Sequence, residues 1–321
     1  MRAAICPAYG PPEVVRVQES PSPDLADGQV LVRVATAAVN FPDVLLIAGE
    51  YQVKVPPPFV PGSEFAGVII ETSCDTGDFV VGDRVTGTGM VGAFAEQVCI
   101  GTGGLAMIPD GIDDSTAAAS GVAFRTAYHA LRSTARVTAG DDIVVLGAGG
   151  GVGLAAVALG SALGARITAV ASSAEKLSAA ARYGAVQGIE HGGGDLRQTL
   201  RAALPGGAAA VIDPVGGELS EPALRSLRRG GRFVTVGFAS GSIPRIPLNL
   251  VLVKGIQVMG FQFQDIPADE FTRNESELRR LLASGAVAPH IGATYPLADA
   301  ARALRHVADG RAIGKVIIDV G

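Results

Sequence analysis

The glycines between Gly147 and Gly153 carry the most specific chemistry in the sequence. They belong to the stretch Asp141–Gly153, in which an apolar strand runs directly into the glycines, and they precede a helical pattern over Leu154–Gly164. Glycine lets a chain turn sharply and lets backbone N–H groups approach a pyrophosphate, while the start of a helix adds unpaired donors and the positive end of its dipole. The pattern favours a site for NAD or NADP, and a tight turn without a ligand is the alternative.

The next strand after this loop, the second of the expected βαβ unit, ends in polar residues that suit a phosphate. Ala165–Ala171 leads into Ser172, Ser173 and Lys176, near the position where a Rossmann fold contacts the adenosine ribose. Two hydroxyls and a cation match the 2′-phosphate of NADPH, whereas an acidic residue would select NAD by binding both ribose hydroxyls. NADPH is therefore the expected cofactor. Ser172 and Glu175 also fit a capping box at a helix start, and both interpretations can hold together.

The composition is that of a folded, water-soluble chain. With 321 residues, 48% of them hydrophobic, the chain is long enough for two domains with a large core. The net charge of −5 offers no basic surplus, so no nucleic-acid partner is expected. The three cysteines are widely spaced, and no apolar run is long enough for a membrane span or an export signal. These features predict a cytoplasmic protein with no membrane partner.

The order of the expected elements divides the chain into a mostly-β part and an alternating part. Residues 1–116 read as short strands broken by Pro and Gly, and residues 117–261 alternate strands with helices as a doubly wound Rossmann domain does. Residues 262–321, with an amphipathic helix near Glu275–Ser284 and a strand at Lys315–Asp319, are expected to complete the first domain. Later strands of the middle part are expected at Ala209–Asp213, Gly231–Gly237 and Ile256–Gly260.

Short motifs over almost the whole chain match one family. They are Val39–Asp43, Tyr51–Gln52, Pro58–Gly67, Gly82–Val85, Thr126–Leu131, the glycine loop, Asp213–Gly217, Pro247–Asn249 and Lys254–Gly255. The chain resembles the medium-chain dehydrogenase/reductase superfamily, specifically its zinc-free, zeta-crystallin-like NADPH:quinone oxidoreductase branch. The resemblance implies an α/β fold with two domains. Residues 1–116 and 262–321 would form a GroES-like, mostly-β catalytic domain, and residues 117–261 a Rossmann NADP-binding domain.

No metal is expected. Zinc-dependent members of the superfamily resemble this chain but carry Cys where Asn40 stands and His where Ser63 stands, because a catalytic zinc needs such ligands to polarise an alcohol or carbonyl oxygen. The four-cysteine structural zinc lobe of those members is also missing. The histidines show no ligand spacing and are expected to be surface or packing residues: His129, His191, His290 and His306.

Hydride transfer from a nicotinamide can still reduce a quinone or another electron-poor enone without a metal, with negative charge developing on an oxygen. By resemblance, Asn40 and Thr126 lie against the nicotinamide, with Asn40 bonding the ribose or carboxamide region. His191 stands where related enzymes often have a Tyr, and a charged imidazole could also meet the phosphate. The remaining cofactor residues implied by the resemblance are Gly150, Gly151, Val152, Gly153, Ser172, Ser173 and Lys176, with Phe238 and Phe263 in covering loops.

Tyr51 is the expected substrate-side residue. Gly49–Tyr51 resembles the Gly-x-Tyr of zinc-free enoyl-thioester reductases, in which the phenol is a proposed proton donor; alternatively Tyr51 only forms a wall of the pocket. Some quinone reductases have a second tyrosine in this pocket, and this chain has Leu45 at that position. Asp43 and Glu64, in Pro-Gly-rich segments, are expected to satisfy backbone N–H groups or to pair with an Arg.

Three functions remain open at this point. The first is reduction of quinones or enones by NADPH, and the second is reduction of enoyl thioesters such as enoyl-CoA on the same scaffold. The third is an NADPH-binding protein with a structural or regulatory role and negligible turnover. A homodimer is expected through edge pairing of the strand Ile256–Gly260.

Overall fold

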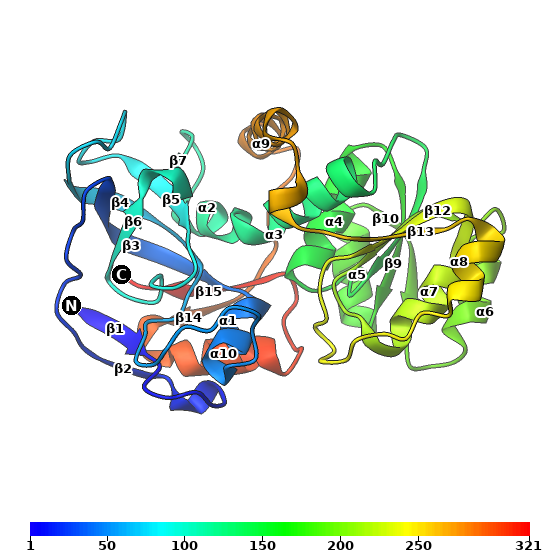
Figure 1. Ribbon diagram of the computed structural model, residues 1–321, viewed down its shortest axis with the longest axis horizontal. Coiled ribbons are helices and arrows are strands. Elements are labelled where there is room, and N and C mark those ends of the chain that lie inside the picture. The colour runs from blue at the N-terminus through cyan, green and yellow to red at the C-terminus, as the bar shows by residue number, and fades with distance from the viewer. The chain divides into compact units, whose positions relative to one another are not determined.

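The computed structural model describes residues 1–321, which form two compact units. Residues 1–122 and 289–321 make unit 1, and residues 123–288 make unit 2. The two ends of the chain, blue and red in Figure 1, therefore belong to the same unit. Each unit contains its own sheet, so each is described by itself.

The sheet of unit 2 has six parallel strands in the order β10-β9-β8-β11-β12-β13. Its strands are β8 (Asp142–Leu146), β9 (Arg166–Ala171), β10 (Ala185–Glu190), β11 (Ala208–Asp213), β12 (Leu227–Thr235) and β13 (Gln257–Gly260). Ile143 to Leu146 are fully buried, as expected where helices cover both faces of a parallel sheet. The Rossmann prediction is confirmed, with strand bounds shifted by a few residues.

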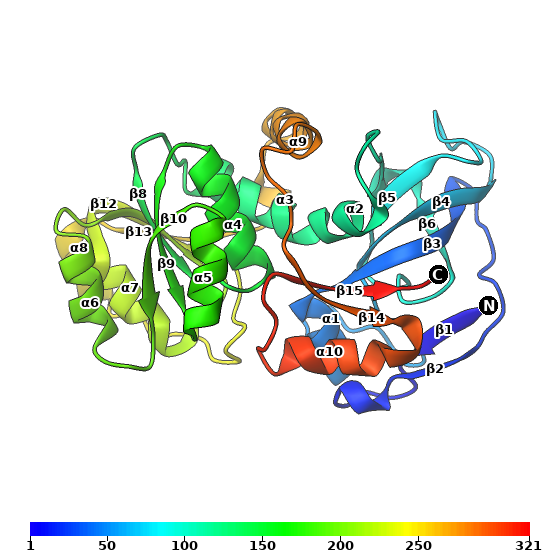
Figure 2. The same cartoon turned by 180° about the vertical axis from the view of Figure 1, so that it is seen from behind.

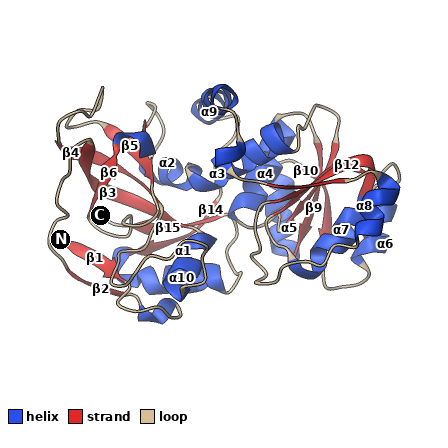
Figure 3. Cartoon of the chain, in the orientation of Figure 1, coloured by secondary structure: helices blue, strands red, loops and turns tan.

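Helices cover both faces of this sheet (Figure 3). Figure 2 shows α4 (Gly151–Ala162) and α5 (Ala174–Arg182) on one face, and α6 (Leu196–Ala203), α7 (Ser220–Ser226) and α8 (Leu248–Lys254) on the other. The strand order reverses at β8, because β9 and β10 extend the sheet to one side and β11 to β13 to the other. The loop that follows β8 therefore lies at the switch point, where parallel sheets bind their ligands.

Unit 1 is built on a seven-stranded sheet in the order β14-β15-β3-β4-β5-β7, with β6 also paired to β3. These strands are β3 (Gln29–Val39), β4 (Glu64–Thr72), β5 (Arg84–Thr88), β6 (Gln97–Gly101), β7 (Leu105–Met107), β14 (Ile291–Pro296) and β15 (Lys315–Asp319). A two-stranded sheet adds β1 (Arg2–Ile5) and β2 (Arg16–Glu19). The helices are α1 (Phe41–Ala48), α2 (Asp114–Ser120) and α10 (Ala300–Ala308). The mostly-β first domain is thus confirmed.

The unit boundaries differ from the expected 116 and 262. Helix α2 contacts β3, β4 and β15 and so belongs to unit 1. Helix α9 (Ala268–Ala283) starts earlier than the amphipathic pattern suggested and belongs to unit 2. The reason is a polar network with α3 (Val122–His129): Glu275 lies 3.0 Å from both Arg125 Nε and His129 Nε2, and the Tyr128 hydroxyl donates to Glu277 at 2.6 Å. No helix is long and apolar enough to cross a bilayer.

Candidate functional site

The glycine loop after β8 leaves no room for side chains where the chain doubles back. A Cβ at Gly153 would lie 2.0 Å from the carbonyl oxygen of Gly147, and Gly147 itself has a left-handed φ of 59°. Helix α4 then begins at Gly151 with Gly150 as its N-cap, and no side chain caps its first N–H groups. Unpaired backbone donors at a helix start are what a pyrophosphate requires. The loop predicted from the sequence therefore has the geometry of a phosphate cradle.

The neighbouring loop after β11 supports this cradle from the other side of the switch point. A Cβ at Gly147 would lie 2.6 Å from Val215 Cγ2, so the two loops pack directly. Asp213 is fully buried and accepts the N–H groups of Val215 and Gly216 at 2.9 and 2.8 Å and the Ser220 hydroxyl at 2.6 Å. The carboxylate thus holds the loop shape, which explains why Asp213 follows an apolar strand.

Polar side chains gather at the end of β9, beside the same cradle. Lys176 Nζ donates to Ser172 Oγ at 3.0 Å, and a Cβ at Gly149 would touch the Lys176 side chain at 2.5 Å. Ser173 caps α5, because its hydroxyl accepts the Lys176 N–H at 3.3 Å. The capping residue of α5 is therefore Ser173 and not Ser172, and the Ser172 hydroxyl lies beside the Lys176 ammonium. Burial lowers the pKa of Lys176.

His191 joins this group from the next strand. It follows β10, and its N–H donates to the carbonyl oxygen of Ala171 at the end of β9. Burial, and then the charge of Lys176, lower the pKa of the His191 imidazole. Both effects favour the neutral form of the ring. It retains a ring N–H that can donate to a phosphate.

The other expected cofactor residues of unit 2 lie on three different elements. Thr126 is 9% exposed on α3, and Phe238 follows β12, where a Cβ at Gly216 would lie 2.8 Å from its ring. Phe263, in the 3₁₀ turn Phe263–Asp265, meets Phe261 edge-to-face at 5.0 Å between ring centroids. Arg125 lies over the Phe263 ring at 5.6 Å. Sequence reasoning missed this last contact, which ties the Phe263 turn to the helix that carries Thr126.

In unit 1, Asn40 stands at the junction between β3 and α1. It is 7% exposed and is the N-cap of α1. Its backbone N–H donates to Asp43 Oδ2 at 2.7 Å, so Asp43 satisfies a backbone group as expected. Asp43 is completely buried, and its other oxygen has no hydrogen-bond partner. Burial raises the pKa of the Asp43 carboxyl to about 7, against the opposing hydrogen bond from Asn40.

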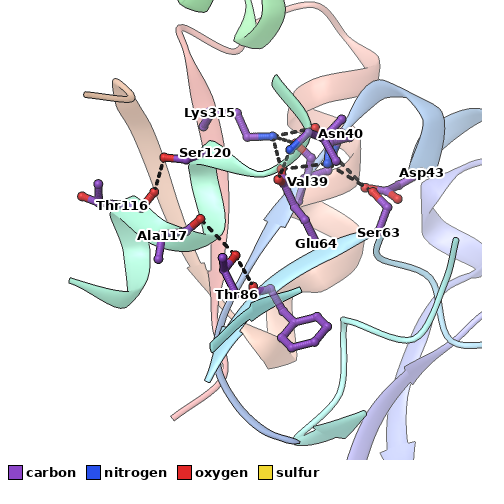
Figure 4. A network of polar contacts seen from close by, with 12 residues as sticks. Val39, Asn40, Asp43, Ser63, Glu64, Thr86, Thr116, Ala117, Ser120 and Lys315 are labelled. Atoms are coloured by element: carbon purple, nitrogen blue, oxygen red, sulfur yellow. Dashed lines mark hydrogen bonds and ion pairs between the residues drawn. The ribbon is translucent and has the colours of Figure 1, made fainter. Parts of the chain in front are cut away.

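Strand pairing brings Asn40 together with Glu64 and Lys315. Val39 of β3 pairs with Val316 of β15, and Ala38 pairs with Glu64 of β4, so the residues at these strand ends are neighbours. The resulting buried polar cluster, which we define as Asn40, Ser63, Glu64 and Lys315, is shown in Figure 4. Lys315 Nζ lies 2.6 Å from both Asn40 Oδ1 and Glu64 Oε1 and 3.2 Å from the carbonyl oxygen of Val39.

The remaining bonds of the cluster use both N–H groups of the Asn40 amide and both oxygens of Glu64. Asn40 Nδ2 donates to Glu64 Oε1 at 2.9 Å and to Ser63 Oγ at 3.2 Å. Glu64 Oε2 accepts the N–H of Val122, the first residue of α3, at 2.6 Å. Glu64 thus satisfies a backbone group as expected, but its charge partner is Lys315 and not an arginine. The only sequence signal for Lys315 was a lysine at the start of an otherwise apolar strand.

Tyr51 follows α1 after the left-handed Gly49, and its N–H donates to the carbonyl oxygen of Leu45 at 3.2 Å. It is partly buried against the core of unit 1. The nearby Lys54 ammonium bonds the carbonyl oxygen of Gly49. Ser63 also borders a cavity of about 230 Å³, lined mainly by apolar residues that include Phe65, Val91 and Ile100.

No cluster of three or more His, Cys, Asp or Glu side chains suited to a metal is present. His129 is fully buried and stacks on Phe271 at 4.9 Å, so it is a packing residue. The three cysteines are free thiols.

Comparisons with known proteins agree with this geometry. Residues 26–110 match the alcohol dehydrogenase GroES-like domain, and residues 151–281 match the zinc-binding dehydrogenase domain. Quinone oxidoreductase-like protein 2 of Mus musculus is 35% identical, over 99% of this chain and 92% of its own length. Quinone oxidoreductase of Homo sapiens is 30% identical, over 99% of this chain and 97% of its own.

A solved structure extends the likeness to three dimensions. The quinone oxidoreductase of Escherichia coli in complex with NADPH is 28% identical, with a TM-score of 0.92 over all of both chains. The sequence relatives cover nearly the full length of the chain, and both domain models fall within the units observed here. The chain therefore belongs to the medium-chain dehydrogenase/reductase family, in its quinone oxidoreductase-type branch.

Proposed function

We propose that the chain binds NADPH and uses it to reduce quinones or other electron-poor enones. The observation that carries the cofactor choice is the group of Ser172, Lys176 and His191 at the end of β9, where no carboxylate stands to bind both ribose hydroxyls. A cation and hydroxyl donors suit a doubly charged phosphate. The Escherichia coli relative was solved with NADPH, which supports the same choice.

The residues present fit the cofactor. A Cβ would clash with neighbouring atoms at Gly147, Gly149 and Gly153, and no side chain caps the start of α4, so a pyrophosphate can reach the N–H groups of Gly151, Val152 and Gly153. We propose that Thr126, Asn40, Phe238 and Phe263 contact the nicotinamide half. When bound, NADPH supplies a hydride.

We propose that unit 1 manages the charge that this hydride creates. As the substrate gains the hydride, negative charge develops on its carbonyl oxygen, and a positioned proton donor lowers that barrier. Tyr51 carries a phenol next to the segment that Asn40 begins, and we assign it this proton transfer. The reaction proceeds without a metal in this proposal, because Asn40 and Ser63 bond each other and provide no thiolate or imidazole.

The names of the sequence relatives support a quinone as substrate. An enoyl thioester would need cations for its phosphates, and Lys54, the lone cation near Tyr51, bonds the carbonyl oxygen of Gly49. The quinone is therefore the favoured substrate.

The substrate class can be tested with one panel under saturating NADPH. It would hold 1,4-benzoquinone, 9,10-phenanthrenequinone, a simple enone and crotonyl-CoA, with absorbance at 340 nm as readout. We expect turnover with the quinones and slower turnover with the enone. Turnover with crotonyl-CoA alone would reassign the chain to enoyl-thioester reduction. Tight NADPH binding with no turnover on any substrate would favour a regulatory or structural role.

We also propose a homodimer in a reducing, cytoplasmic setting. Strand β13 is the last strand of its sheet, and Val258 on it is 45% exposed. Helix α8, beside it in sequence, exposes Leu248 and Leu252 at 77% and 83%. An unpaired edge strand with nearby apolar side chains suits pairing with a second copy. Light scattering of Leu252→Lys would test this, with a shift to the monomer mass expected.

A further inference from the structure

The carboxamide of Asn40 is held at both ends by opposite charges. Its oxygen accepts from the Lys315 ammonium at 2.6 Å, and its nitrogen donates to the Glu64 carboxylate at 2.9 Å. The two ends of an Asn amide have nearly the same shape, so hydrogen-bonding partners decide its orientation. A flipped amide would place its NH₂ against the ammonium and its oxygen against the carboxylate. The charge pair therefore selects a single orientation (Figure 4).

Counting donors and acceptors shows what Asn40 can still offer a ligand. Both N–H bonds of Nδ2 are used, one toward Glu64 and one toward Ser63. Oδ1 has two lone pairs, and Lys315 occupies one of them. The open hydrogen-bonding capacity of Asn40 is therefore one acceptor position, and the side chain has no donor to spare.

From this count we infer that Lys315 and Glu64 are positioning residues that present Asn40 to the cofactor as a hydrogen-bond acceptor. The inference rests on the proposed contact between Asn40 and the nicotinamide half. The matching group on the cofactor is a donor, either a ribose hydroxyl or the carboxamide NH₂. An ammonium bonded to Oδ1 also draws electron density from the amide and keeps its oxygen from rotating away.

The pair does more than join strands. Replacing a buried ion pair with well-packed apolar side chains is often neutral or stabilising, so burial of these two charges is poorly explained by stability alone. Lys315 uses one of its three donors on Asn40, and Glu64 uses one oxygen on Asn40 and the other on the N–H of Val122. A Cβ at Gly121 would lie 2.8 Å from that second oxygen, so the site is built around the carboxylate.

Helix α3 gives the same carboxylate a second task. Val122 is its first residue, and Thr126 lies one turn further along the same helix. By accepting the Val122 N–H, Glu64 satisfies one of the backbone donors at the start of that helix. Glu64 therefore bonds both the Asn40 amide and the first residue of α3.

The experiment compares two ligands on matched variants by calorimetry. NADPH reports on both halves of the cofactor, and 2′,5′-ADP reports on the phosphate half only. In Lys315→Met we expect NADPH to bind about tenfold more weakly, because one well-oriented hydrogen bond to the cofactor is lost. We expect 2′,5′-ADP to bind as it does to the parent. Arg305→Met removes the exposed Arg305–Glu13 ion pair of the same unit and is the control, with both affinities unchanged.

A double variant separates positioning from folding. Lys315→Met leaves Glu64 buried without its partner, whereas Lys315→Met with Glu64→Gln removes both charges and restores neutrality. Neither end of the Asn40 amide is then distinguished by charge, so we expect NADPH affinity to stay low while thermal stability recovers. If the single variant does not fold, the double variant carries the test.

Three outcomes would overturn the inference: parent-like NADPH affinity in Lys315→Met, equal losses for both ligands, or full recovery of NADPH affinity in the double variant. Asn40→Ala separates this failure from failure of the proposed function. If Asn40→Ala weakens NADPH and Lys315→Met does not, positioning by Lys315 is wrong. If Asn40→Ala also leaves NADPH binding unchanged, the assignment of Asn40 to the cofactor is wrong.

Discussion

The glycine loop of unit 2 and the buried polar cluster of unit 1 handle charge in opposite ways. The loop uses neighbouring residues, Gly147–Gly153, and offers backbone N–H groups at a helix start. The cluster joins Asn40 to Glu64 and Lys315, which are 24 and 275 residues away in the chain, and balances full charges out of contact with water. The structure of the loop depends on the absence of side-chain atoms, and the structure of the cluster depends on the balance of its charges.

This difference predicts how each region fails. A loop that must accommodate a close backbone approach is damaged by one added methyl group. A cluster of paired charges tolerates changes in shape better than the loss of one partner.

Gly153→Ala should cause the largest loss. Its Cβ would lie 2.0 Å from a backbone oxygen, so the loop must move away from its phosphate-binding shape. We expect NADPH affinity to fall by roughly 100-fold or more, because the N–H donors at the helix start lose their alignment. Gly206→Ala, where a Cβ meets nothing within 4 Å, is the matched control by the same calorimetry. Equal affinities for both variants would contradict the cradle.

Tyr51→Phe tests unit 1 in the same reaction. Loss of the phenol proton should lower kcat with an enone by about 100-fold, the lower end of general acid catalysis, while the KM for NADPH stays the same. Stopped-flow absorbance gives both numbers. An unchanged kcat would make Tyr51 a wall of the pocket and leave solvent as the proton source.

Lys176→Ala should alter cofactor choice more than turnover. Loss of a charge-assisted contact to the 2′-phosphate should cut the ratio of kcat/KM for NADPH over NADH by about 10- to 100-fold. Arg182→Ala, an exposed cation on the same helix, is the control. A ratio that does not change in Lys176→Ala would place the phosphate elsewhere.

Asp43→Asn acts on stability, and its effect depends on pH. The Asp43 carboxyl has a pKa of about 7 in the folded chain and an ordinary pKa of 3.8 when exposed, so between these pH values the unfolded chain releases a proton that the folded chain keeps. This term makes the free energy of unfolding fall as pH rises from about 4 to about 7, and it is constant above.

The Asp43→Asn variant lacks that term. Relative to the parent, it should therefore gain stability on the order of 1 to 3 kcal/mol between pH 5 and pH 8. Urea unfolding at both pH values measures the change. A difference between the two proteins that does not vary with pH would show that Asp43 is ionised in the folded chain throughout, held by Lys315 nearby.

The same contrast explains which features the sequence could predict. Sequence reasoning could predict the glycine loop, the Ser172 to Lys176 group and the strands around them, because the residues of each are contiguous and their periodicity is local. The extent of α9 was missed because its place is set by Arg125, His129 and Glu275, which meet only after folding.

The charge partner of Glu64 was likewise hidden. Nothing local distinguishes a lysine at the start of a strand that will be exposed from one that will be buried. The register of β15 against β3, which pairs Val316 with Val39, decides that Lys315 meets Asn40. Long-range strand pairing of this kind is fixed by the whole hydrophobic pattern and cannot be read from one segment.

The most direct test of the central claim is the oxidation of NADPH and of NADH by 9,10-phenanthrenequinone with the purified protein, followed at 340 nm. The account predicts steady turnover with a kcat/KM for NADPH well above that for NADH. Absence of turnover with both cofactors, or a clear preference for NADH, would contradict it.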